Sequence, residues 1–150
     1  QQLESLSPNY PKAHLIKAAA LYRLGRYTEA LTSIEAELRL RNHPEAYFYQ
    51  ALVYRGLSDT TAERSALENL LLANIKGRIT YQLDAVSPRV LQITEGDAGN
   101  RRLRTIFDQL YALFPTERSV VSTLAEIHNR LGEQAKAAEL MQRFPAATTR

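Results

Sequence analysis

The feature that most constrains the fold of this chain is an internal repeat. The stretch LGRYTEAL at positions 24–31 returns in similar form as LGEQAKAA at positions 131–138. The two stretches are 107 residues apart, which is three repeat units of about 34 residues plus about five residues. Ala18 similarly recurs as Ala51, about one such unit further along the chain. Self-similarity at this period is typical of helical-repeat arrays, in which each hairpin buries its apolar face against the next. The sequence therefore predicts a stack of hairpins.

Gly25 indicates how one hairpin turns. Apolar side chains recur at helical spacing from Pro11 to Leu24 and again from Tyr27 to Leu40, on either side of this glycine. A helix often ends at a residue with positive φ, which glycine adopts at low cost. Gly25 and its later counterpart Gly132 are therefore predicted to be structural turn residues. In the second copy, the break at positions 56–59 predicts a slightly shorter turn, by about one residue.

These patterns define one domain over residues 1–150, made of hairpin repeats. Residues 1–10 are predicted to be the tail of a preceding repeat, so we expect the chain to be a slice of a longer array. The predicted repeats cover residues 11–43, 44–77, 78–116 and 117–145.

The middle repeat is irregular, because the surplus of about five residues must lie within it. Residues 87–93 could form a short first helix with Ser87 as its cap and Pro88 at its first position. Residues 79–86 instead alternate between apolar and polar, as a strand does, and could pair with residues 89–94 in a β-hairpin. We expect a distorted helical hairpin, with the β-hairpin as the alternative.

The repeats resemble the tetratricopeptide repeat, whose unit is a helical hairpin of about 34 residues. The resemblance implies an all-α, right-handed superhelical solenoid of antiparallel helix hairpins. Lys17 and Gln50 depart from the family pattern, which usually has leucine there. The matching residues are Ala18, Leu21, Gly25, Tyr27, Ala30, Ile34 and Leu38 in the first repeat, Tyr47, Ala51, Tyr54 and Ala62 in the second, and Val121, Leu124, Ala125, Gly132, Ala137 and Met141 in the last.

In this family the first helices of successive repeats line a concave groove that binds partners. The residues that this register places in the groove combine aromatic and arginine side chains, which are enriched in interface hot spots. Leu15 and Ala19 stand where the family's chaperone-tail clamp has lysine and asparagine, which argues against that specialised role. The predicted partner-binding residues are Tyr22, Arg23, Phe48, Tyr49, Arg55, Asn129 and Arg130.

Several kinds of chemistry lack a motif in this chain. There is no cysteine, no pair of histidines at metal-binding spacing, no phosphate-binding glycine loop and no nucleophile elbow. We therefore predict no catalytic residue, no metal site and no cofactor. The apolar runs are far shorter than the roughly 20 residues that span a bilayer, so this segment is not expected to enter a membrane.

The predicted function is a non-catalytic scaffold that binds a partner protein through its groove or edge. Two alternatives stay open: a substrate-recruiting region of a larger enzyme, and an RNA-binding module that uses Arg101, Arg102 and Arg104. The net charge is only +3, and the basic residues are interspersed with acidic ones. Nucleic acid is therefore the less expected partner. By resemblance alone, arrays of this composition favour the periplasm or envelope of a Gram-negative bacterium, in secretion or exopolysaccharide export, with the cytoplasm as the alternative.

Overall fold

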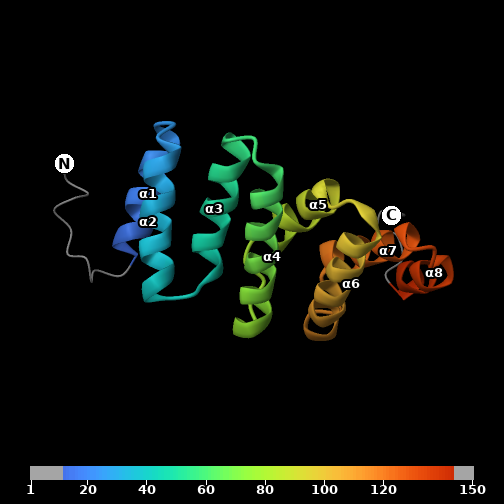
Figure 1. The fold of residues 1–150 in the computed structure, drawn as a ribbon. Coiled ribbons are helices and arrows are strands. Elements are labelled where there is room, and N and C mark those ends of the chain that lie inside the picture. The colour runs from blue at the N-terminus through green and yellow to red at the C-terminus, as the bar shows by residue number, and fades with distance from the viewer. Residues whose placement is uncertain (1–11, 144–150) are drawn as a thin grey trace, which may run out of the picture. The chain divides into compact units, whose positions relative to one another are not determined.

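The computed structural model describes residues 12–143, and the predicted tail at residues 1–10 lies outside them. The regular secondary structure of this part of the chain is all helix, with no strand, which confirms the all-α prediction (Figure 1). Its helices are α1 (Ala13–Arg23), α2 (Tyr27–Leu40), α3 (Pro44–Gly56), α4 (Thr60–Gly77), α5 (Leu83–Ile93), α6 (Gly96–Leu113), α7 (Arg118–Arg130) and α8 (Gln134–Arg143).

The chain divides into two compact parts, which meet between Asn74 and Ile75 in the last turn of α4. In the N-terminal part, α1 packs against α2 and α3, and α2 also contacts α3. In the C-terminal part, α7 packs against α5, α6 and α8. In each part, therefore, the first helices of two successive hairpins contact each other: α1 with α3, and α5 with α7. The helix between them, α2 or α6, contacts at least one of the two.

Helix α2 buries one of its faces. In α2 the buried positions are Ala30, Ser33, Ile34 and Glu37, which follow the i, i+3, i+4, i+7 pattern of an amphipathic helix. Ala30 and Ile34 join Ala18, Leu21 and Val53 in one buried cluster. This cluster draws on α1, α2 and α3, so the N-terminal part has a core shared between successive hairpins.

Three hairpin turns have the same backbone geometry. After α1, Gly25 has a φ of 76° and its N–H donates to Tyr22; after α7, Gly132 has a φ of 78° and donates to Asn129. After α3, the equivalent residue is Ser58, with a φ of 60°. Ser58 follows Gly25 at the same interval at which Ala51 follows Ala18. Residues 24–26 and 57–59 are turns of equal length, so the predicted shortening of the second turn is wrong.

Gly56 has a different structural role in the second hairpin. A Cβ atom added at Gly56 would lie 2.6 Å from Cζ of the Tyr27 ring. The missing side chain thus makes room for an aromatic ring of α2 against the end of α3.

Exchanging the turn residues should change stability in opposite directions. A left-handed backbone costs a non-glycine residue roughly 1–2 kcal/mol, part of which glycine offsets through its greater freedom in the unfolded chain. We expect Gly25→Ser to lower the free energy of unfolding by about 1 kcal/mol and Ser58→Gly to raise it by about 0.5 kcal/mol. A Cβ at Gly25 would meet no atom within 4 Å, so packing does not confound the comparison. Urea unfolding followed by circular dichroism measures both, and a loss of stability in Ser58→Gly would contradict the assignment.

The middle of the chain is helical, so the alternative β-hairpin is not formed. Residues 89–93 belong to α5 instead of a strand, and α5 begins at Leu83, earlier than the predicted short helix. Pro88 therefore lies inside the helix, and Ser87 is buried rather than being a cap. The earlier start lets Leu83, Val86, Ser87 and Val90 share one buried face.

Candidate partner-binding face

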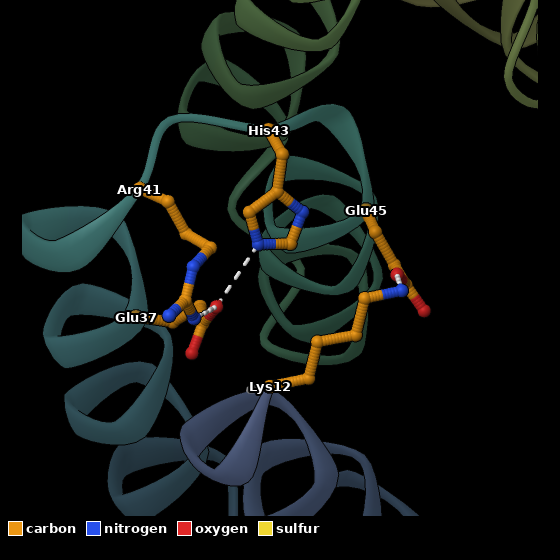
Figure 2. Close-up of polar contacts among 5 residues, drawn as sticks. All are labelled: Lys12, Glu37, Arg41, His43 and Glu45. Atoms are coloured by element: carbon orange, nitrogen blue, oxygen red, sulfur yellow. Dashed lines mark hydrogen bonds and ion pairs between the residues drawn. The ribbon is translucent and has the colours of Figure 1, made fainter. Parts of the chain in front are cut away.

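The first helices of the two N-terminal hairpins meet at their N-terminal ends. The Lys12 ammonium, just before α1, donates a hydrogen bond of 2.8 Å to the Glu45 carboxylate in the first turn of α3 (Figure 2). The two residues are one repeat length apart in the sequence. Because α1 and α3 also pack together, this ion pair brings equivalent positions of successive hairpins side by side.

The predicted aromatic residues of this region are half-buried. Tyr22 and Tyr49 pack against the buried cluster of the N-terminal part, and the Tyr22 ring lies 5.9 Å from the Tyr27 ring. The Phe48 and Tyr49 rings make an edge contact at 5.9 Å. Each ring therefore contributes to packing and still presents part of its surface to solvent.

Arg23 and Arg55 lie at the C-terminal ends of α1 and α3, and both are exposed. Within residues 12–143 neither side chain has a hydrogen bond or an ion pair. Ile16 is 42% exposed on α1, and Leu24 is 68% exposed beside Arg23. We define the α1–α3 face as the surface that joins these elements, made of Lys12, Ile16, Arg23, Glu45, Phe48, Tyr49, Leu52 and Arg55.

The two predicted residues of the C-terminal part have other surroundings. Asn129 is exposed in the last turn of α7. Arg130 donates through Nη1 to the carbonyls of Leu91 at 2.8 Å and Thr94 at 3.2 Å, and to Oδ1 of Asn100 at 3.3 Å. These acceptors lie at the end of α5 and the start of α6. Arg130 thus adds a charged donor to carbonyls at the end of a helix, where the regular i to i+4 hydrogen bonds are lacking.

A buried carboxylate ties α2 to the loop that follows it. The Glu37 side chain is fully buried, and its Oε2 accepts a 2.7 Å hydrogen bond from Arg41. His43 Nε2 lies 3.1 Å from the same oxygen (Figure 2). His43 is the residue immediately before α3, so the cluster fixes the connection between the two hairpins.

The charge on Glu37 is maintained by its neighbours. Burial by itself raises the pKa of this carboxyl, because it disfavours the ionised form. The hydrogen bonds and charges of Arg41 and His43 outweigh burial, so the pKa of Glu37 lies below its usual value of 4.5. The carboxylate is therefore ionised at neutral pH.

A second carboxylate cluster joins α6, α7 and the turn before α8. Glu133 lies 2.6 Å from His128 Nδ1 and accepts a 2.7 Å hydrogen bond from Arg104. The bond with His128 is the first cause of the lowered pKa of Glu133, followed by the bond from Arg104. A hollow of about 230 Å³ adjoins the cluster and is lined by Asp108, Tyr111, Leu124, His128, Lys136, Glu139, Leu140 and Arg143. Its lining mixes both charges, so it has no strong preference for one sign of ligand.

The Glu37 cluster was not among the sequence-based predictions, although its signal is present in the sequence. Glu37 falls on the apolar face of its helix with Ala30 and Ile34, where an acidic residue is out of pattern. One repeat later the same position is Leu70, which is fully buried. An acidic residue at a repeat position that is apolar in the next repeat indicates a buried side chain with a charged or hydrogen-bonding partner.

Comparison with models of known protein families, with curated proteins and with solved structures finds no match for this chain. Within residues 12–143, no three histidine or acidic side chains gather closely enough to hold a metal ion. None of the described helices has the length and hydropathy needed to cross a membrane.

Proposed function

We propose that the chain is a non-catalytic scaffold that binds a partner protein on the α1–α3 face. The observation that carries the proposal is the combination of half-buried aromatic rings with two exposed arginines that have no partner in the described part of the chain. Aromatic and arginine side chains dominate the energetics of protein interfaces. Because packing already orients the rings of Phe48 and Tyr49, little conformational entropy would be lost on binding.

The packing within each part supports a stacked-hairpin scaffold of the tetratricopeptide type. Such a stack requires each first helix to contact its own second helix and the first helix of a neighbouring hairpin. The contacts of α1 with α2 and α3, and of α7 with α5 and α8, follow this rule. The common turn geometry at Gly25, Ser58 and Gly132 is a second line of support.

The RNA-binding alternative receives less support from the arginines assigned to it. Arg104 donates to Glu133, and Arg101 lies 3.8 Å from Asp97. Arg102 also has an interaction partner within the protein. A phosphate would therefore have to compete with a partner that each of these arginines already has within the protein.

A peptide-display selection tests the proposed function. The wild-type chain should enrich binding peptides from a random library, and Tyr49→Ala combined with Arg55→Ala should lose most of them. The matched control is Tyr111→Ala with Arg39→Ala, which removes one half-buried tyrosine and one exposed arginine away from the face. Circular dichroism verifies that both double variants keep their helical signal.

The selection separates the face from the rest of the surface. Loss of peptides in the face variant with retention in the control supports the proposal. If the wild type enriches no peptide, or if the control loses the peptides as strongly as the face variant, the proposed function is wrong.

A further inference from the structure

We infer that the partner segment bound by the α1–α3 face is an acidic peptide with interspersed apolar side chains. This inference rests on the proposed function and specifies the chemistry of its partner. Three observations support it: the charge distribution among the N-terminal helices, the lack of an acidic partner for Arg23 and Arg55 within residues 12–143, and the apolar surface between the charges.

Charge is segregated between the helices of the N-terminal part. Helix α1 contains Lys17 and Arg23 and no acidic residue. The single acidic residue of α3 is Glu45, which is engaged by Lys12. Helix α2, by contrast, carries three glutamates and one arginine. The first helices are therefore the basic side of the N-terminal part, and an acidic segment complements them.

Residues of the α1–α3 face follow one line on each helix. Lys12, Ile16 and Arg23 are spaced by four and seven positions, so they share a stripe of α1. Glu45, Leu52 and Arg55 follow a similar spacing on α3. The Lys12–Glu45 ion pair joins the two stripes at their N-terminal ends. A peptide lying along the two stripes would meet the Lys12–Glu45 ion pair at one end, apolar surface in the middle and the two unpaired guanidinium groups at the other end.

The first helices of the C-terminal part, α5 and α7, do not offer the same chemistry. Arg130 at the end of α7 is held by three acceptors of the protein itself, and its Nε also lies 3.8 Å from Glu126. Arg89 of α5 donates to Gln92. Since these arginines already have partners, the N-terminal part is the better site for an acidic segment.

Three short fluorescein-labelled peptides of equal length test the inference. They share the same leucine and phenylalanine positions and carry glutamate, glutamine or lysine at all other positions. The glutamate peptide should bind the intact chain most tightly, as measured by fluorescence anisotropy. Arg23→Gln with Arg55→Gln should weaken its binding about tenfold, because two exposed charge contacts are lost. The control, Arg39→Gln with Arg78→Gln, removes the same charge from exposed positions outside the face and should change binding less than about twofold.

Each result has a separate meaning for the two proposals. Equal binding of the three peptides, tighter binding of the lysine peptide, or no binding of the glutamate peptide overturns the acidic-partner inference. The display selection would still support the scaffold if its peptides were neutral or basic and were lost in the face variant. A short single-stranded RNA that displaces the glutamate peptide at lower concentration than unlabelled glutamate peptide would assign the face to nucleic acid and overturn the inference.

Discussion

Replacing Glu37 by alanine should lower the free energy of unfolding by about 2–3 kcal/mol, because the substitution leaves a cavity in a fully buried position and removes the acceptor shared by Arg41 and His43. The cost is smaller than for a fully buried ion pair, because the Arg41 side chain is 41% exposed and can be hydrated when its partner is lost. Urea unfolding of the full chain measures the effect.

Glu37→Leu provides the matched comparison, because Leu70 occupies the same position one repeat later. Replacing a buried ion pair by an apolar residue of similar volume is often neutral or stabilising. We therefore expect Glu37→Leu to match the wild type or to exceed its stability by up to about 2 kcal/mol. If leucine destabilises as strongly as alanine, the hydrogen bonds of the carboxylate would be essential to the connection between α2 and α3.

The same pair of proteins isolates the pH dependence of Glu37. Its pKa in the folded state lies below 4.5, so its contribution to stability is present above pH 4.5 and is lost as the pH falls through the folded-state value. The stability of the wild type relative to Glu37→Leu should therefore be constant near neutral pH and decline below about pH 4.5. A difference that does not change with acidification would show that the carboxyl has the same pKa in the folded and unfolded states.

Replacing Arg130 by alanine should cost about 2 kcal/mol, because the carbonyls of Leu91 and Thr94 would lose a charged donor. Arg130→Lys keeps the charge but lacks the forked guanidinium, and it should recover only part of the loss. Arg39→Ala removes an exposed arginine of α2 and should change stability by less than about 0.5 kcal/mol. Urea unfolding compares the three variants with the wild type.

Binding measured on the same variants separates the two roles considered for Arg130. If Arg130→Ala leaves stability unchanged and weakens binding of the glutamate peptide, its helix-end contacts would be incidental and its predicted role in partner binding would gain support. Loss of stability with unchanged peptide binding would favour the structural role.

The sequence was sufficient to predict an all-α chain, because the apolar spacing of α2 is helical and its hairpin turn recurs later in the chain. It did not reveal that Ser58 adopts the left-handed turn, since residue type alone favoured the nearby Gly56. The start of α5 was missed for a similar reason, because Pro88 resembled a first-turn proline. In α5 the burial of a whole face outweighed the local preference of Pro88 for a first turn.

The candidate face was only partly predictable. Helical register indicated that Tyr22, Arg23 and Arg55 belong to the first helices, and the structure places them there. It could not indicate that Arg130 reaches back to the end of α5, because that contact joins positions far apart in the sequence. Nor could it distinguish an unpaired arginine from one held by an acceptor distant in sequence.

The close approach of Tyr27 to Gly56 provides a natural spectroscopic reporter. The Hα protons of a glycine beside an aromatic ring experience its ring current, so their NMR resonances should lie away from the usual glycine region. The two residues belong to successive hairpins, and their contact lasts only while α2 and α3 stay packed. The Gly56 resonances would therefore show whether the hairpins separate before the helices melt, without the introduction of any label.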